Sequence, residues 1–283
     1  MLLISLLVFQ VIGFEHLTVD PVAHRVGMGY AKIGDGYNVH YNPAGLAYVM
    51  GPYYSASYCS YIAGTHFGYL GIEQKQLGVG IRYFNSGSMK KTDALGQEYG
   101  TFGVHFIDLS VGKGFFLQDF CVGVSIKGAY TRIDTLYALG VGIDVGALYL
   151  LPDPELQFGL AVKNLGTGVK PYIEANEGFP YEVNLSAVKH LPNGWIGLDL
   201  VKPALMDFGI RFGGAYAVID NFELKASYTT LLSSMQTGSS GLDFLAGLTV
   251  GFGIAVNTFN IHYSYAPYFD LGDGHRISLS LGG

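Results

Sequence analysis

The stretch FCVGVSIKGAY, residues 120–130, decides the fold because its side chains alternate in character along its whole length. One set of alternate positions is mostly large and apolar: Phe120, Val122, Val124, Ile126, Gly128 and Tyr130. The other set is small or polar: Cys121, Gly123, Ser125, Lys127 and Ala129. Successive side chains of a β-strand point to opposite faces of a sheet. The stretch therefore predicts a strand with one apolar face and one face of small and polar residues.

The same two-faced pattern recurs along most of the chain. It is present in residues 77–83, 105–111, 139–147, 156–163, 208–213, 222–228 and 276–281. Turn residues separate about fourteen such runs, many of them near the roughly ten residues with which a tilted strand crosses a bilayer. A soluble β-sandwich would also alternate, but its polar face would be rich in Lys, Glu and Thr rather than Gly, Ala and Ser. We therefore expect an all-β chain forming a transmembrane antiparallel barrel of about fourteen strands.

The composition agrees with a chain that exposes little of its surface to water. Hydrophobic residues make up 49% of the chain and charged residues 13%, whereas about a quarter of an ordinary soluble domain is charged. In hydrocarbon every backbone N–H and C=O must be paired within the protein, and a closed barrel achieves this. The formal charge of -6 and the scattered 16 Lys and Arg residues argue against nucleic acid as a partner.

The chain begins with the apolar segment MLLISLLVFQVIGF. This segment is shorter than the roughly 20 apolar residues of a transmembrane helix, and the small residue Gly13 at its end suits a signal peptidase. A buried core helix is the alternative, but the segment lacks an amphipathic pattern. We predict that residues 1–13 are a cleaved signal peptide. The protein is then expected in the bacterial outer membrane as an integral protein surrounded by lipid.

Residues 14–50 do not alternate, and a barrel needs no such prefix. Within them Leu17–Arg25 is predicted to form a short helix around Pro21. We expect the whole segment to fold back into the barrel lumen as a plug. Residues 51–283 then form the barrel.

The plug segment contains the compact element Asn42-Pro43-Ala44-Gly45. A residue before proline is biased toward an extended or turn conformation. The small residues that follow let the backbone approach a neighbour closely. The element is therefore expected to turn the chain against the inner face of the barrel.

Two stretches resemble a known family. VGMGYAKIGDGYNVHYNPAGLA, residues 26–47, resembles the N-terminal signature of the PorV/PorQ family, a branch of the FadL-type outer-membrane barrels. The final GDGHRISLSLGG, residues 272–283, is similar to the last strand of that family. The matching positions are Gly27, Met28, Gly29, Ala31, Asp35, Asn42, Pro43, Ala44, Gly45, Leu46, Ala47, His275, Arg276 and Ser278. The resemblance implies a barrel plugged by its N-terminal segment.

The resemblance also implies a function. In FadL-type barrels the Asn-Pro-Ala element belongs to a hatch, and hydrophobic compounds pass through a lumenal pocket and leave sideways between strands. Hatch or plug roles are thereby implied for Gly27, Met28, Gly29, Asp35, Asn42, Pro43, Ala44 and Gly45. The alternative is that the motif is a packing turn that seals the lumen. The PorV/PorQ branch implies a second function, an accessory or shuttle subunit of a secretion system that holds an exported protein cargo.

Isolated charges and polar groups lie on the small-residue face of the predicted strands and are expected to point into the lumen. They are Arg82, Lys127, Asp144, Asp199, Arg211, Glu223, Lys225, His262 and Arg276. Charges withdrawn from water are usually paired. Their mixed signs therefore predict an internal paired network rather than a water-filled bore.

A hydrolase is the remote alternative. His262 and Ser264 lie two residues apart on one strand face, as in a His-Ser pair of an outer-membrane lipid hydrolase. The apolar parity belongs to Ile261 and Tyr263, so His262 is expected to face the lumen, away from lipid. We expect no enzymatic activity, no cofactor and no metal. The two cysteines, Cys59 and Cys121, are predicted to be strand residues, and the sequence leaves open a disulfide between them.

The connections between strands differ in length. Asn85–Thr101 and Gly166–Pro180 are predicted extracellular loops, and Leu151–Glu155 is a predicted short turn on the other side. Tyrosines near strand ends are expected at the membrane interfaces. They are Tyr53, Tyr54, Tyr83, Tyr130, Tyr149, Tyr228 and Tyr268.

Overall fold

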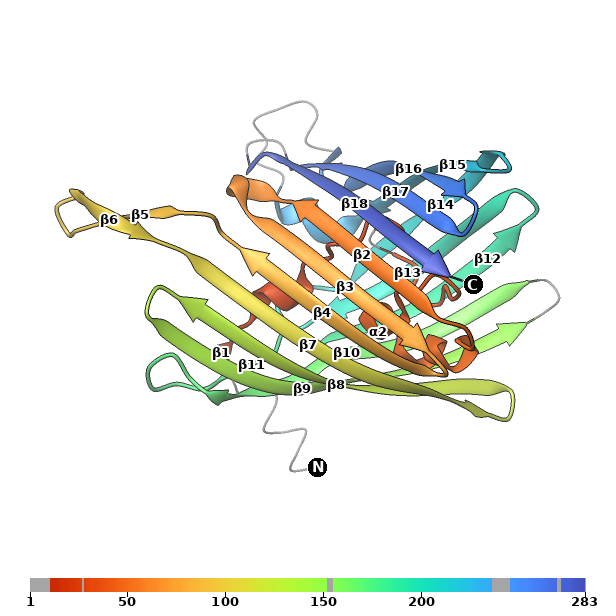
Figure 1. Cartoon of the computed structure of the whole chain (residues 1–283), viewed down its shortest axis with the longest axis horizontal. Coiled ribbons are helices and arrows are strands. Elements are labelled where there is room, and N and C mark those ends of the chain that lie inside the picture. The colour runs from red at the N-terminus through yellow and green to blue at the C-terminus, as the bar shows by residue number, and fades with distance from the viewer. Residues whose placement is uncertain (1–10, 27, 152–154, 236–244, 269–270, 283) are drawn as a thin grey trace.

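The chain folds into a closed antiparallel β-barrel (Figure 1). The structure, a computed structural model, describes residues 11–26, 28–151, 155–235, 245–268 and 271–282. Within these residues fourteen strands form the wall, and β18 pairs with β2 to close it. The wall strands are β2 Tyr53–Ser60, β3 His66–Gln74, β4 Leu77–Asn85, β7 Val104–Leu117, β8 Phe120–Ile133, β9 Leu136–Leu151, β10 Leu156–Lys170, β12 Glu182–Leu191, β13 Gly194–Pro203, β14 Gly209–Ile219, β15 Phe222–Thr229, β16 Leu248–Val256, β17 Phe259–Pro267 and β18 Asp273–Gly282. The predicted barrel of about fourteen strands is confirmed.

The alternation of the sequence becomes the two faces of the wall. In β8 the side chains of Cys121, Ser125 and Lys127 are buried on the lumenal side, whereas Ile126 on the outer side is 67% exposed. The same contrast holds along β18, where Arg276 is buried and Ile277 is exposed. The outer face is therefore apolar around the barrel, as a lipid-facing surface requires. Among the described residues, no helix has the length and apolar character needed to cross a bilayer.

The two ends of the barrel differ in the length of their connections. At one end, here called the short-turn end, two-residue turns join the strands at 75–76, 118–119, 192–193, 220–221 and 257–258. At the other, the long-loop end, the connections include 61–65, 86–103, 171–181, 204–208 and 268–272. Outer-membrane barrels carry short turns on the periplasmic side and longer loops outside. The long-loop end is therefore the expected extracellular end.

Two of the predicted loops contain more strand than expected. The first holds a hairpin of β5, Met89–Thr92, and β6, Glu98–Phe102, which reaches beyond the barrel (Figure 1). The second prediction was partly wrong, because β10 continues to Lys170 with 15 residues. A register shift after Val162 lets it continue, with Asn164 in the left-handed region at φ 57°. The predicted turn Leu151–Glu155 lies largely outside the described residues.

The predicted helix around Pro21 was wrong. The plug instead has a 3-10 helix η1, Glu15–Thr18, followed by extended and turn residues. Asp20 precedes the proline, and a residue in that position is disfavoured in helical backbone. Its carboxylate accepts a hydrogen bond from the N–H of Val22 at 3.0 Å, which stabilises a turn.

The rest of the plug forms two short helices at the short-turn end. They are α2, Asn38–Tyr41, and the 3-10 helix η2, Pro43–Tyr48. At the long-loop end, β1, Val11–Ile12, pairs in parallel with β11, Glu177–Gly178. Residues 1–10 of the predicted signal peptide lie outside the described residues, so its cleavage stays a prediction.

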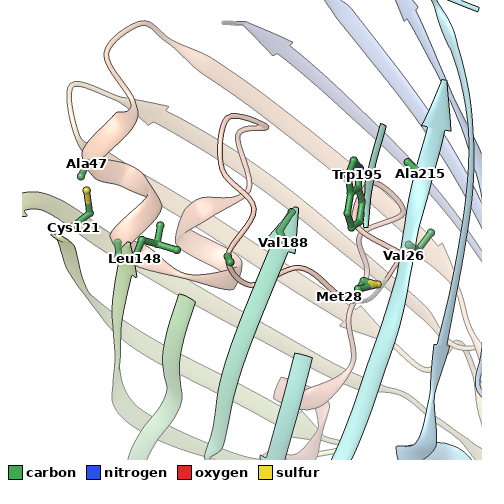
Figure 2. Close-up of a cluster of buried hydrophobic side chains, with 10 residues drawn as sticks. Val26, Met28, Ala47, Cys121, Leu148, Val188, Trp195 and Ala215 are labelled. Carbon is green, nitrogen blue, oxygen red and sulfur yellow. The ribbon is translucent and has the colours of Figure 1, made fainter. Parts of the chain in front are cut away.

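Hydrophobic side chains of the plug and the wall pack together in shared clusters. Figure 2 shows side chains of the plug meeting side chains of the strands. The cluster contains Val26, Met28, Ala31, Ala44, Ala47, Cys121, Leu148, Val188, Trp195 and Ala215. The plug is therefore packed against the lumenal face as part of the fold.

The tyrosines and cysteines complete this picture. Tyr54 and Tyr83 are exposed on the outer face as expected. Tyr53 instead packs inward against Val39, Leu46 and Val49 of the plug segment, and its ring lies close to Gly36. Cys59 and Cys121 are both buried and free, without a disulfide.

Candidate functional site: the plugged lumen and its cavity

Asn42 fastens the plug to the wall at the short-turn end. Its side-chain oxygen accepts a hydrogen bond from the N–H of Ala44 at 3.0 Å and caps η2. Its Nδ2 donates to the carbonyl of Tyr30 in the plug at 3.1 Å. The same nitrogen lies 3.4 Å from the carbonyl of Ala147 in β9 and 3.3 Å from that of Leu160 in β10. One buried amide thus joins two parts of the plug to two neighbouring wall strands.

A patch of glycines receives η2. A Cβ at Gly123 would lie 2.2 Å from the carbonyl carbon of Pro43, and one at Gly114 would lie 2.1 Å from the backbone nitrogen of Ala47. Separations this short are sterically forbidden between non-bonded atoms, and here the neighbours are backbone atoms that cannot rotate away. The wall can therefore hold only glycine at these two positions while η2 keeps its place.

A buried ion pair holds the middle of the plug. Arg25 donates from Nε to Oδ2 of Asp35 at 2.6 Å and from Nη2 to Oδ1 at 2.7 Å. Its guanidinium also lies over the ring of Tyr41, 4.3 Å from the centroid. Burial alone would raise the pKa of Asp35, but the charges of Arg25 and Lys32 hold that pKa well below its usual range. The carboxylate is therefore ionised inside the barrel.

Asp20 organises a second polar cluster nearer the long-loop end. It accepts a hydrogen bond from the hydroxyl of Tyr41 at 2.7 Å, and His40 Nε2 lies 3.3 Å away. Burial lowers the pKa of His40 to about 3, against the opposing pull of Asp20. His40 is therefore neutral at neutral pH.

The structure places the predicted plug residues as follows. Met28 belongs to the core cluster, and Gly29 has φ +83° and donates its N–H to Asp199 at 2.8 Å. Pro43 and Gly45 lie in η2, buried. Gly27 lies outside the described residues, and the hatch role of the whole set stays a prediction.

Most of the predicted lumenal charges have partners. The ion pairs are Lys127 with Asp144 at 3.1 Å, Arg211 with Glu182 at 3.4 Å and Lys225 with Glu223 at 2.8 Å. Asp199 accepts from Ser186 as well as from Gly29. The described lumen is thus crossed by paired charges on several strands.

Arg82 holds the outer part of the plug through backbone carbonyls. Its guanidinium donates to the carbonyls of His16 at 2.7 Å, Leu17 at 3.0 Å and Val19 at 2.8 Å. Arg276 does the same at Asp20, where Nε donates to the carbonyl at 2.8 Å. These two wall arginines therefore determine where the segment around η1 lies.

Sequence reasoning missed Arg25 and Asp20. A signal for both was present, since each is a charge inside a segment predicted to be buried, and buried charges need partners. Arg25 and Asp35, opposite in sign and ten residues apart in such a segment, are a natural pair.

His262 and Ser264 both face the lumen, as predicted. His262 Nδ1 lies 3.0 Å from Lys225 Nζ, and its ring packs against that of His24 with 4.1 Å between centroids. Ser264 is fully buried. The hydrogen bonds of the described residues include none between these two side chains, so the pair lacks the contact that activates a serine.

A cavity of 330 Å³ opens at the long-loop end. Plug residues of the segment 15–20 and Val26 form its floor. Apolar and aromatic side chains from loops and strand ends line it: Tyr61, Tyr181, Leu205, Met206, Leu231 and Tyr268. Arg211 and Arg276 also line it. The volume lies at the low end of the range of small-molecule sites, roughly 300–1,000 Å³.

Two solved structures share this architecture. The toluene transporter TodX of Pseudomonas putida aligns with 94% of this chain and 99% of its own, with a TM-score of 0.58 and 11% sequence identity. CymD, a monoaromatic hydrocarbon channel, aligns with 95% of this chain and 97% of its own, with a TM-score of 0.55 and 13% identity. No protein-family profile and no curated protein sequence matches the chain. At such low identity the likeness shows the fold alone, so this chain has the fold of these two channel proteins, and its place in the PorV/PorQ branch stays a prediction.

Proposed function

We propose that this protein is a non-enzymatic barrel of the bacterial outer membrane that takes up small hydrophobic molecules at its long-loop end. The observation that carries the proposal is the 330 Å³ cavity, whose floor is the plug itself. A molecule bound there touches both the wall and the plug. The fold shared with TodX and CymD, whose names describe a toluene transporter and a hydrocarbon channel, supports the same class of ligand.

The lining of the cavity favours an apolar body with a polar end. The aromatic rings of Tyr61 and Tyr268 and the side chain of Leu205 offer apolar contact. Arg276 binds the carbonyl of Asp20 and the hydroxyl of Tyr268, both neutral groups. A ligand with a polar or anionic end would therefore orient that end toward Arg276.

Passage requires the plug to shift. Two hollows deeper in the lumen, one beside Val39 and Arg82 and one beside Asp20 and Tyr30, measure 10 and 20 Å³. Each is about the size of one water molecule. A ligand moves the plug only if it binds the shifted state more tightly than the resting one. We propose the segment 15–20 as the part that moves, with Asn42, Pro43 and Ala44 remaining as the seal.

A cavity-filling variant tests this function. Thr249 lines the cavity, and Thr249→Trp should occupy it without touching the plug anchors. Thr101→Trp, on the exposed face of β6, is the matched control. Uptake of radiolabelled toluene and of decanoate into proteoliposomes should fall at least tenfold for Thr249→Trp and stay unchanged for the control. Equal uptake by both variants and the wild type would show that the cavity is not on the route.

One feature favours a second candidate function, the accessory subunit of a secretion system. The β5–β6 hairpin projects beyond the barrel, and two of its large side chains, Leu95 and Tyr99, are 84% and 69% exposed. Exposed apolar side chains on a projecting hairpin suit contact with another protein. A photo-crosslinker at position 99 in cells should then capture an exported protein that is lost when residues 88–102 are replaced by a short turn. Unchanged secretion after that replacement would exclude this role.

A further inference from the structure

Three hydrogen-bonded tyrosine–histidine pairs lie on the outer face near the long-loop end. Tyr58 on β2 is hydrogen-bonded to His66 on β3, with 2.8 Å between the hydroxyl and Nδ1. Tyr83 on β4 is hydrogen-bonded to His105 on β7 at the same distance. The third pair, on β17 and β18, is Tyr263 with His275 at 2.7 Å. All three join residues that are diagonal neighbours across an antiparallel strand pair. The same geometry thus recurs three times and places a band of polar groups on an otherwise apolar surface.

The histidines lie on one cross-strand row. The register pairs Ser60 with both His275 and His66, and Asn85 with both His66 and His105. His66 and His105 are therefore two strand spacings apart, or roughly 10 Å. Arg132 of β8, which is exposed, is the register partner of His105 and extends the row. The row of histidines thus ends at the positively charged Arg132, near the expected extracellular rim of the barrel.

An apolar hollow of 320 Å³ adjoins these pairs on the outer face. It exists because Ala56 and Gly68 are small where neighbouring strands carry large residues. Its lining includes Leu70, Ile81, Ile277 and Leu279 as well as the two tyrosines Tyr58 and Tyr83. The tyrosine hydroxyls connect the hollow directly to His66 and His105.

The chemistry of the pairs is specific. When a tyrosine hydroxyl donates to Nδ1 of a neutral imidazole, the ring proton sits on Nε2, which then donates to an outside acceptor. The described hydrogen bonds of His66 and His105 use Nδ1. In that tautomer His66 and His105 each present an Nε2–H, and Arg132, whose Nε donates to the carbonyl of Asp134 at 2.9 Å, has its remaining guanidinium N–H groups; these donors suit phosphate oxygens.

We propose that this face binds one phosphorylated lipid of the outer leaflet. An acyl chain occupies the hollow around Gly68, and the phosphorylated headgroup accepts hydrogen bonds from His66, His105 and Arg132. An apolar groove ending in donors for an anion matches a lipid better than a protein partner, because the groove lies on the membrane-facing surface. The site lies outside the lumen and needs no part of the proposed transport function.

Native mass spectrometry of the purified full-length protein in mild detergent tests the proposal, with diphosphoryl lipid A as the probe and phosphatidylcholine as the comparison lipid. The wild type should hold one lipid A at least tenfold more tightly than phosphatidylcholine. His66→Phe combined with His105→Phe keeps an apolar surface but removes both donors, and should weaken lipid A binding about tenfold or more.

A matched glycine pair tests the hollow. Gly68→Leu fills it, and a Cβ there meets only the carbonyl of Ser57 at 3.9 Å, so the strand itself is not strained. Gly128→Leu makes the same change on the outer face of β8, where nothing lies within 4 Å. Lipid A affinity should fall about tenfold for Gly68→Leu and stay unchanged for Gly128→Leu. Equal affinities across wild type, the histidine variant and both leucine variants would overturn the proposal.

A measurement on the unaltered protein removes any dependence on the folding of variants. Diethyl pyrocarbonate modifies accessible imidazoles, and modified residues are identified by peptide mass. Lipid A in detergent should slow modification of His66 and His105 several-fold, whereas phosphatidylcholine should not. Equal modification rates in the two lipids would also contradict the proposal.

Discussion

The two ends of the plug are held in the barrel by different kinds of interaction. At the short-turn end η2 rests its backbone on Gly114 and Gly123, and Asn42 binds the carbonyls of two strands. At the long-loop end the segment around η1 is held by hydrogen bonds from Arg82, and it borders a cavity. Close packing of backbone against backbone is lost as a unit when the two surfaces separate. Hydrogen bonds to carbonyls, in contrast, can be exchanged one at a time with water or a ligand. The first end therefore acts as a seal, and the second end is the place where the plug can respond to a ligand.

The largest expected effect comes from breaking the ion pair between the two ends. Arg25→Met leaves the buried carboxylate of Asp35 without its bidentate partner, and loss of one partner of such a pair costs about 3–5 kcal/mol. Urea unfolding in detergent micelles should show a loss of that size. The double variant Arg25→Met with Asp35→Leu should recover part of it, since the carboxylate is gone, while Lys32 at 3.8 Å and the N–H of Tyr37 lose their acceptor. A double variant as unstable as the single one would contradict this account.

The glycine patch gives the next largest effect. Gly123→Val places a side chain against the backbone of Pro43, and overpacking of this kind costs about 1–3 kcal/mol. Gly128→Val on the same strand is the control, because that position is open to the outside. Hydrogen exchange should speed up in residues 42–48 of the first variant and remain slow in the second. If both variants behaved alike, the seal would not depend on backbone contact.

A smaller effect is expected at the responsive end. Arg82→Met removes the donors to three plug carbonyls, of which only that of Val19 belongs to a residue lining the cavity, where water can replace the lost donor. The cost should be about 1–2 kcal/mol. Hydrogen exchange should rise in residues 15–19 and stay unchanged in 42–48. Uptake of toluene into proteoliposomes should increase if the proposed function is right. A uniform rise in exchange across the plug would mean that the two ends are not independent.

The effect that is smallest at neutral pH is a pH dependence, which grows as the pH falls. Burial lowers the pKa of His40 to about 3, whereas in the unfolded chain a histidine titrates near 6.5. Between these values the unfolded state binds a proton that the folded state does not, so the free energy of unfolding falls as the pH falls. The slope for one histidine is at most about 1.4 kcal/mol per pH unit. His40→Gln should reduce the change of the urea unfolding midpoint between pH 6.5 and 4. If the midpoint of the variant changed with pH as steeply as that of the wild type, this would count against a neutral buried His40.

Much of the fold could be predicted because alternation is a local property. The parity of residues 120–130 identified both the strand and its two faces, and the mixed lumenal charges indicated pairing. The length of β10 was missed because Gly166 and Gly168 look like loop residues, while the bulge at Asn164 that extends the strand depends on the wall around it. The wall partners of Asn42 lie 105 and 118 residues away, and one sequence carries no signal for such contacts.

The same separations lead us to expect a particular order of assembly. The plug segment precedes the strands that receive it, and contacts across such long loops form late because their closure entropy must first be overcome. Strands β7, β8 and β9 must be in place before η2 has a surface to rest on. We therefore expect a barrel with an unfilled bore to form first, and the plug, which precedes the wall strands in the sequence, to take its place afterwards.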